Sequence, residues 1–205
     1  MSKVLLAPNG KPSNLTPKQY KLVRTPPFKK WFGDWENDPA NSSKVVDDNG
    51  EPLVVYHRAK SNFYEFNSGS DLIGWLGRGF YFSPNKNEFK EYGRTVLTCF
   101  LNIKKIFKVK GESPTDIISE TKSMNKNTNN GFLDVSIILK DNGYNGVLFK
   151  HWDRGVIITC FEPNQIKLAD GTNTTFDTSN NDIRFEQGGK TQSSTPDYLR
   201  MFLGK

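Results

Sequence analysis

Cysteine, histidine and long apolar runs are scarce in this chain of 205 residues, which contains two cysteines and two histidines. Cys99 and Cys160 each lie inside an expected strand, and no further cysteine or histidine stands at the spacing of a zinc site. We therefore expect two buried thiols and no metal. No run of eighteen apolar residues is present, and residues 1–12 contain neither a long apolar region nor a small-residue cleavage site. We expect a soluble chain that is not conventionally exported and has no membrane partner.

A strong excess of one charge is also missing, because 28 basic residues stand against 22 acidic ones for a net charge of +6. A basic balance can favour nucleic acid, but scattered lysines more often only solvate a surface. No helix-turn-helix, zinc-finger or RRM signature accompanies the charge. We favour a solvated surface and leave an RNA or nucleotide partner open. With 35% apolar and 13% aromatic residues, the chain can form one domain with tails.

The features that bear on chemistry gather in one stretch of the first half of the chain. Residues 53–56 form a β-rich apolar run after a turn, so we expect His57 where a buried strand ends. Gly77 and Gly79 precede a second, aromatic strand that presents Tyr81. The glycine-rich connection between the two strands either borders a ligand or is an ordinary long loop.

A short helix is expected after the second strand, over residues 84–92. Ser83 is a suitable N-cap, a proline follows it, and Phe89 and Tyr92 are three apart on one helical face. A single histidine after an apolar strand is more often structural than catalytic. Only the combination of His57 with the two tyrosines therefore indicates a site.

Apolar patterns elsewhere predict the remaining elements of a mixed fold. A strand is expected over residues 95–103, extended by residues 104–110. Residues 112–130 are polar, and within them residues 124–130 are expected to form a surface loop or a partly disordered insertion. Helical spacing after residue 131 predicts a helix that stops at Gly143. Two further strands are expected, over residues 144–150 and 156–161.

Before this region, a helix is expected to begin at Thr16 and Pro17 and to end at Pro26. The aromatic residues of 28–35 then have nearly helical spacing, which indicates core packing.

Three parts of the chain are therefore expected. Residues 1–50 form a helical aromatic segment that packs on the domain, and residues 51–186 form the domain itself. Residues 187–205 form a linker and a short amphipathic helix, which docks either on its own domain or on another protein.

Seven segments occur in the order found in a known family: LTPKQYKLVRTPPFKKWFGDWENDP, GEPLVVYH, GRGFYFS, FLNIKK, GYNGVLF, FEPNQIK and NNDIRF. With them the chain resembles the histidine–tyrosine class of ADP-ribosyltransferases, the diphtheria-toxin and poly(ADP-ribose)-polymerase-like clade. More closely, it resembles the ADP-ribosyltransferase domains of polyvalent proteins of phages and conjugative elements. The resemblance implies an α+β fold in which two roughly orthogonal antiparallel sheets, a split β-sandwich, form a cleft for NAD as substrate, without a metal.

The resemblance also implies roles for individual residues. His57 would hydrogen-bond a ribose hydroxyl, the backbone of Arg58 would face the carboxamide, and Tyr81 and Tyr92 would sandwich the nicotinamide ring. Ile157 stands where the family places its catalytic glutamate, and isoleucine cannot accept a hydrogen bond from the ribose.

The chain departs from the family at two further positions. Phe89 replaces a serine of the polymerase branch, and Arg58 replaces the glycine that usually follows the histidine. The candidate site residues fall into two groups: catalytic, His57, Tyr81 and Ile157; and NAD-binding, His57, Arg58, Tyr81, Phe89 and Tyr92.

The function that this resemblance implies is mono-ADP-ribosyl transfer from NAD to a host macromolecule, by a phage-encoded protein in the bacterial cytoplasm or delivered with a phage particle. The acceptor, protein or nucleic acid, is left open. One alternative is a non-catalytic binding or structural phage protein whose pocket is filled by Arg58 or Phe89. A second is a basic protein associated with nucleic acid.

Overall fold

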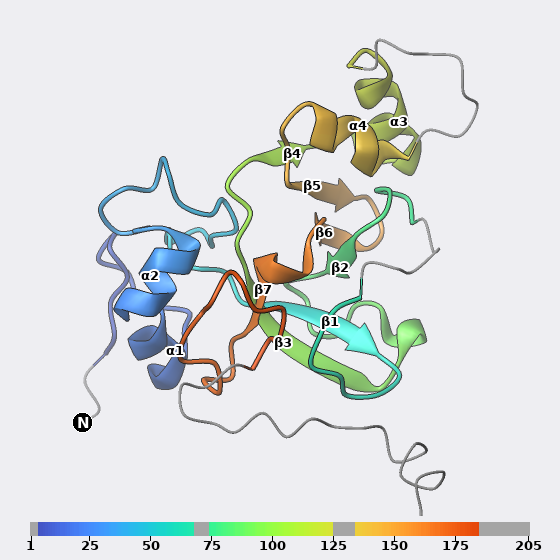
Figure 1. The fold of residues 1–205 in the computed structure, drawn as a ribbon. Coiled ribbons are helices and arrows are strands. Elements are labelled where there is room, and N and C mark those ends of the chain that lie inside the picture. Colours follow the sequence, from blue (N-terminus) through green and yellow to red (C-terminus); the bar gives the residue numbers. More distant parts are fainter. Residues whose placement is uncertain (1–3, 68–73, 125–133, 185–205) are drawn as a thin grey trace, which may run out of the picture.

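The computed structural model describes residues 4–67, 74–124 and 134–184, and within them the chain is an α+β fold with two sheets (Figure 1). The mixed fold expected from the sequence is thereby confirmed. The helices are α1 (Pro17–Leu22), α2 (Pro26–Phe32), α3 (Pro114–Lys122) and α4 (Val135–Asp141), with short 3-10 turns η1 (Lys90–Tyr92) and η2 (Pro163–Gln165). The strands are β1 (Val55–Ala59), β2 (Phe80–Phe82), β3 (Thr95–Leu101), β4 (Ile106–Lys108), β5 (Gly146–His151), β6 (Gly155–Cys160) and β7 (Ile166–Leu168).

One sheet has the strand order β1-β3-β7 and the other has the order β2-β6-β5-β4. All neighbours are antiparallel except β4 and β5, which run parallel. The expectation of two purely antiparallel sheets is therefore wrong for one pair. Residues 104–110 do not extend β3 either, because the chain leaves β3 at Leu101 and enters the other sheet as β4.

The two sheets meet where β1 passes the end of β2. Tyr56 and Ser83 exchange backbone hydrogen bonds of 2.8 and 3.0 Å across this junction. Apolar side chains from both sheets, including Val55, Phe82 and Ile158, bury themselves in one core between them. Burial of this kind supplies most of the driving force for folding, because it removes apolar surface from water. The core also holds Cys99 and Cys160 as free, buried thiols, as the sequence predicts.

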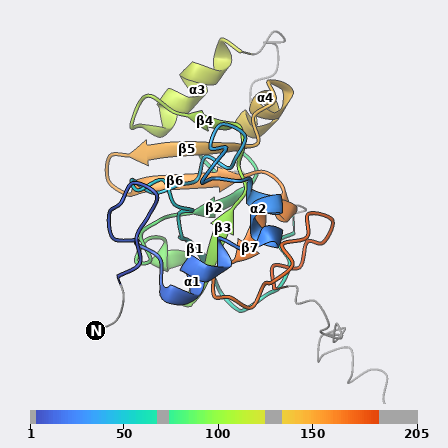
Figure 2. The same cartoon turned by 90° about the vertical axis from the view of Figure 1, so that its left-hand side faces the viewer.

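Helices cover the two sheets at opposite ends of the molecule (Figures 1 and 2). α3 and α4 pack on the four-stranded sheet through a core that includes Ile117 and Leu139. α3 lies in the polar segment 112–130, for which no helix was predicted, whereas the loop or insertion expected at residues 124–130 falls, from residue 125 on, outside the described residues. Ser113 and Asp116 form a capping box around Pro114, which is enough to begin a helix in an otherwise polar segment.

The N-terminal segment packs on the three-stranded sheet. Thr16 caps α1 as predicted, but the helix ends at Leu22, and Pro26 is the first residue of α2 rather than the end of α1. The ring of Phe28 lies 5.2 Å from that of Phe100 in β3 and 4.9 Å from that of Phe176. The aromatic residues of this segment are therefore core residues, as their spacing indicates.

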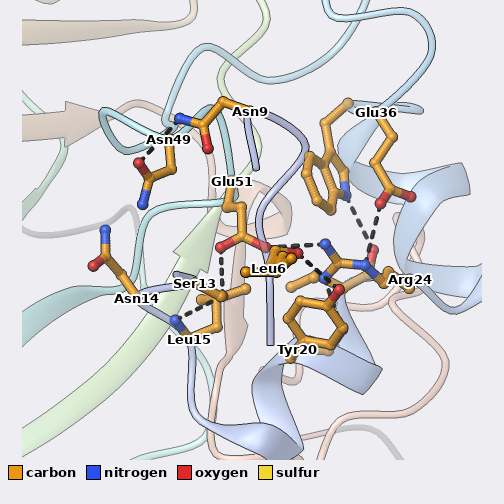
Figure 3. A network of polar contacts seen from close by, with 12 residues as sticks. Leu6, Asn9, Ser13, Asn14, Leu15, Tyr20, Arg24, Glu36, Asn49 and Glu51 are labelled. Atoms are coloured by element: carbon orange, nitrogen blue, oxygen red, sulfur yellow. Dashed lines mark hydrogen bonds and ion pairs between the residues drawn. The ribbon is translucent and has the colours of Figure 1, made fainter. Parts of the chain in front are cut away.

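A buried carboxylate also ties this segment to the rest of the fold (Figure 3). Glu51 is fully buried; it accepts a hydrogen bond of 2.5 Å from the hydroxyl of Ser13 and forms an ion pair of 3.0 Å with Arg24. Arg24 in turn pairs with Glu36 at 3.1 Å. A buried charge is tolerated only when it is paired and hydrogen-bonded, so Glu51 depends on both N-terminal partners.

Two expectations near the candidate site are wrong. His57 is the third of the five residues of β1 and not the residue at which the strand ends. Residues 84–92 do not form an α-helix: turns lead into η1, and Phe89 adopts the left-handed conformation with φ of 61°. Of the helices in the described ranges, none has the length and apolar character that a membrane span requires. The linker and helix expected at residues 187–205 lie outside the described residues.

Candidate active site

A cavity of about 740 Å³ opens between the two sheets, a size typical of sites for small molecules and cofactors. Its wall comes from β1, β2, β6, the connection after β1, and the segment that leads into η1. All six candidate residues from the sequence lie on this wall: His57, Arg58, Tyr81, Phe89, Tyr92 and Ile157. Residues up to 100 positions apart in the chain are thus brought together, although their chemical roles remain predictions.

His57 reaches the cavity from the middle of β1. Its Nδ1 lies 2.9 Å from the backbone carbonyl oxygen of Tyr81, and because a carbonyl only accepts, Nδ1 carries the proton. Nε2 is then the acceptor nitrogen. Burial lowers the pKa of His57 below its ordinary value of 6.5, and the Tyr81 carbonyl only partly opposes this effect. The imidazole is therefore neutral at pH 7 and can accept a hydrogen bond from a ligand hydroxyl.

Aromatic rings fix the plane of this imidazole. The ring centroids of Phe66, Phe82 and Phe63 lie 5.0, 5.4 and 6.0 Å from that of His57. Phe63 and Phe66 come from the connection after β1, which therefore lines the cavity, as expected for a segment that borders a ligand.

Tyr81 is held at both ends. In β2 its backbone pairs with Thr159 of β6, and its hydroxyl donates to the carbonyl of Gly77 at 2.6 Å and accepts from the amide of Leu76 at 3.1 Å. A side chain at Gly74 would collide with this hydroxyl, because its Cβ would lie 2.4 Å from the oxygen. Burial raises the pKa of Tyr81 well above its ordinary value, so the phenol stays protonated. The ring is a fixed, neutral wall of the cavity.

The turn that receives this hydroxyl is anchored by the N-terminus of α4. Asp134 caps that helix, and its carboxylate also accepts from the backbone amide of Arg78 at 3.1 Å and pairs with the Arg78 guanidinium at 3.0 Å. Gly77 has φ of 83° and lies so close to Asp134 that a Cβ would be 2.5 Å from the carboxylate. Glycine is therefore required at this position.

The opposite rim is made by the segment around η1. Tyr92 is 62% exposed, and its ring meets that of Phe89 edge-on at 6.0 Å. Arg154, in the turn between β5 and β6, holds this segment through ion pairs of 2.5 Å with Glu91 and 3.6 Å with Glu88. The hydrogen bond from Arg154 lowers the pKa of Glu91. Tyr92 thus lines the cavity from a 3-10 turn rather than from an α-helix, and the ion pairs of Arg154 connect this turn to the start of β6.

Ile157 and Arg58 are two of the three positions at which the sequence departs from the pattern of the resembling transferases. Ile157 is 2% exposed and packs in the same apolar cluster as Tyr81 and Phe89. Arg58 turns its guanidinium to the carbonyl of Lys86 at 2.6 Å, while its buried Nε has no hydrogen-bond partner among the described residues. The cavity is present with both Arg58 and Phe89 in place, so neither side chain fills it.

The sequence analysis did not single out Trp75, Glu65 or Arg154, which also line the cavity. Trp75 is the tryptophan of the glycine-rich connection, and its large ring was the sequence feature that could have identified it. Arg154 lies in a turn, and nothing in its neighbourhood distinguished it from other surface cations. Within the described ranges no group of three histidine, cysteine or acidic residues could hold a metal ion.

This arrangement suits a flat aromatic ligand joined to polar groups. Two tyrosine rings offer stacking surfaces, His57 offers a neutral acceptor, and the Arg58 side chain adds positive charge to the wall. The nicotinamide, ribose and phosphate groups of NAD match these features, so the residues present fit NAD.

The chain was compared with family models, curated proteins and solved structures. A model of the family described as "ADP-Ribosyltransferase in polyvalent proteins" matches residues 47–176. No curated protein matches the chain. Among solved structures, the crystal structure of an anti-CRISPR protein aligns with 56% of this chain and 91% of its own, at 13% identity and a TM-score of 0.34.

Proposed function

The chain belongs to the family of ADP-ribosyltransferases in polyvalent proteins, and from that premise we propose that it binds NAD in the cavity and transfers a single ADP-ribose unit to a macromolecule. One observation carries the proposal: Tyr81, Tyr92 and a neutral His57 line a single cavity of sufficient size. ADP-ribosyltransferases use NAD as substrate, and the matched residues include the whole cavity wall.

The proposed reaction breaks the bond between C1′ of the ribose and the nicotinamide nitrogen. The bonding electrons leave with nicotinamide, and the ribosyl group passes through an oxocarbenium-like transition state before the acceptor attacks C1′. Such a loose transition state needs orientation and electrostatic support more than covalent help. Tyr81 and Tyr92 would hold the ring, and Nε2 of His57 would accept a hydrogen bond from a ribose hydroxyl.

Transfer of a single unit, rather than polymer growth, is supported by Ile157. In the resembling polymerases, chain elongation requires the carboxylate at the position of Ile157 to activate a ribose hydroxyl of the preceding unit, and an apolar, buried side chain at that position cannot do so. The proposal extends to a phage-encoded protein that acts on a macromolecule of its bacterial host, which rests on the resemblance to polyvalent proteins of phages and conjugative elements.

Labelled NAD tests this function directly. The purified chain would be incubated with a bacterial lysate and NAD labelled in the adenylate group, and label on macromolecules would be followed by gel electrophoresis. We expect transfer that requires Tyr81 and produces discrete bands rather than ladders. Label that appears equally with Tyr81→Ala would contradict the proposal. Saturable NAD binding without transfer or nicotinamide release would favour a non-catalytic binding protein instead.

A further inference from the structure

The proposed transfer leaves one proton without a base. When the acceptor's lone pair bonds to C1′, the acceptor must lose a proton, and a positioned side chain usually takes it. Ile157 has no group that can do so. Nε2 of His57 is assigned to a ribose hydroxyl in the proposed complex, and burial makes the imidazole a weaker base than usual. A carboxylate on the cavity wall would serve both as the base and as a counter-charge to the oxocarbenium ion.

Among the described residues that line the cavity, Glu65 is the only carboxylate. Its side chain is exposed and makes no hydrogen bond or ion pair with another described residue. Other acidic residues near the rim are already engaged, since Glu88 and Glu91 both pair with Arg154. Glu65 is thus a carboxylate on the wall that is available to a ligand.

The backbone around Glu65 is fixed relative to His57. On either side of it, the rings of Phe63 and Phe66 pack against the imidazole. Residue 65 also forms a backbone bridge with Asp182, and the neighbouring amide of Ile183 donates to the segment at 2.9 Å. The segment therefore carries the carboxylate on a supported part of the wall rather than on a free loop.

We infer that Glu65 supplies the carboxylate that position 157 lacks, an inference that rests on the proposed function. The C1′–N bond breaks, and nicotinamide leaves with its electron pair. The acceptor oxygen or nitrogen bonds to C1′, and its proton passes to the Glu65 carboxylate and then to solvent. The products are ADP-ribosyl acceptor, nicotinamide and one proton. Water in place of the acceptor gives ADP-ribose by the same steps.

The test compares wild type, Glu65→Gln and Glu112→Gln. Glu112 is exposed and does not line the cavity, so its substitution makes the same charge change elsewhere. NAD affinity would be measured by calorimetry, and kcat and KM from nicotinamide release. We expect Glu65→Gln to lower kcat about 100-fold with KM changed by less than about threefold. Glu112→Gln should match wild type.

A second variant separates chemistry from structure. In Glu65→Ala the missing carboxylate leaves space, and added formate should raise kcat about tenfold or more because it supplies the lost base. A merely structural role would not respond to formate. Glu65→Gln with wild-type kcat, or Glu65→Ala unmoved by formate, would overturn the inference while leaving NAD binding and turnover intact. Wild type that binds NAD without releasing nicotinamide would overturn both the inference and the proposed transfer, and would favour a non-catalytic binding protein. Wild type that fails to bind NAD would overturn the proposed function as well.

Discussion

Nδ1 of His57 lies 2.9 Å from the carbonyl oxygen of Tyr81, so one hydrogen bond joins β1 of the first sheet to β2 of the second. The same contact fixes the tautomer of the imidazole and leaves Nε2 as an acceptor. Two residues that the sequence places 24 positions apart are therefore coupled both in structure and in the proposed chemistry.

The first prediction follows from the lowered pKa of His57. In the unfolded chain this imidazole titrates near its ordinary value of 6.5, whereas burial lowers the pKa in the folded state. As pH falls through about 6.5, the unfolded state binds a proton that the folded state does not, so the free energy of unfolding decreases. We expect NMR to show the His57 ring titrating below pH 6.5.

His57→Gln provides the control, because glutamine cannot titrate. The decrease in unfolding free energy below pH 6.5 should become smaller in this variant when both proteins are compared by urea denaturation. A His57 ring that titrates above its ordinary value would contradict the buried, neutral imidazole on which the site depends.

A second prediction concerns Lys167, which is fully buried and donates to the carbonyls of Asn180 at 2.5 Å and Asp182 at 3.0 Å. Burial lowers its pKa to about 8, from 10.5. Between these two values the unfolded chain binds more protons than the folded chain, so this residue makes stability rise with pH. We expect Lys167→Met to remove that rise. Parallel slopes for the two proteins over this range would disprove the shift.

The third prediction tests the link between the N-terminal segment and the sheets (Figure 3). Arg24→Met removes the cation from fully buried Glu51 and should lower the free energy of unfolding by about 3 kcal/mol. Asn9→Ala removes an exposed hydrogen bond to Asn49 in the same region and should cost less than about 0.5 kcal/mol. Urea denaturation measures both. Equal, small effects would show that Glu51 does not depend on its ion pair.

The fourth prediction returns a carboxylate to the position that the family normally uses. Ile157→Glu in a Glu65→Gln background should restore nicotinamide release, because the new carboxylate enters the same cavity. It should also lower stability by several kcal/mol, since residue 157 is 2% exposed. Ile157→Gln in the same background is the control for size. A folded double variant no faster than this control would argue against residue 157 facing the reacting ribose.

Many residues of this site could be predicted from the sequence, because short patterns of neighbouring residues place them on strands. The strand FYF with flanking glycines placed Tyr81, and apolar runs placed His57 and Ile157 on strands. The position of His57 within its strand could not be predicted, because the ends of β1 depend on pairing with residues 95–99 of β3. Such pairing is tertiary and overrides local propensity.

The rim around Tyr92 was misread for a similar reason. A proline after a good N-cap favours a helix, but Arg154 binds Glu88 and Glu91 from a distant turn, and Phe89 takes a left-handed conformation. α3 was not predicted from the sequence, although its capping box around Pro114 is visible there, because the residues around it are polar.

Calorimetric titration with NAD shows directly whether the cavity binds the dinucleotide between Tyr81 and Tyr92. Tyr92 is largely exposed, so Tyr92→Ala should fold normally and lose stacking worth about 0.5–1.5 kcal/mol, or roughly 2- to 12-fold in affinity. Tyr81→Ala should also weaken binding, whereas Trp152→Ala, an exposed ring outside the cavity wall, should not. We expect saturable binding to wild type and to Trp152→Ala, and weaker binding to the two tyrosine variants. No saturable binding, or the same affinity in all four proteins, would contradict it.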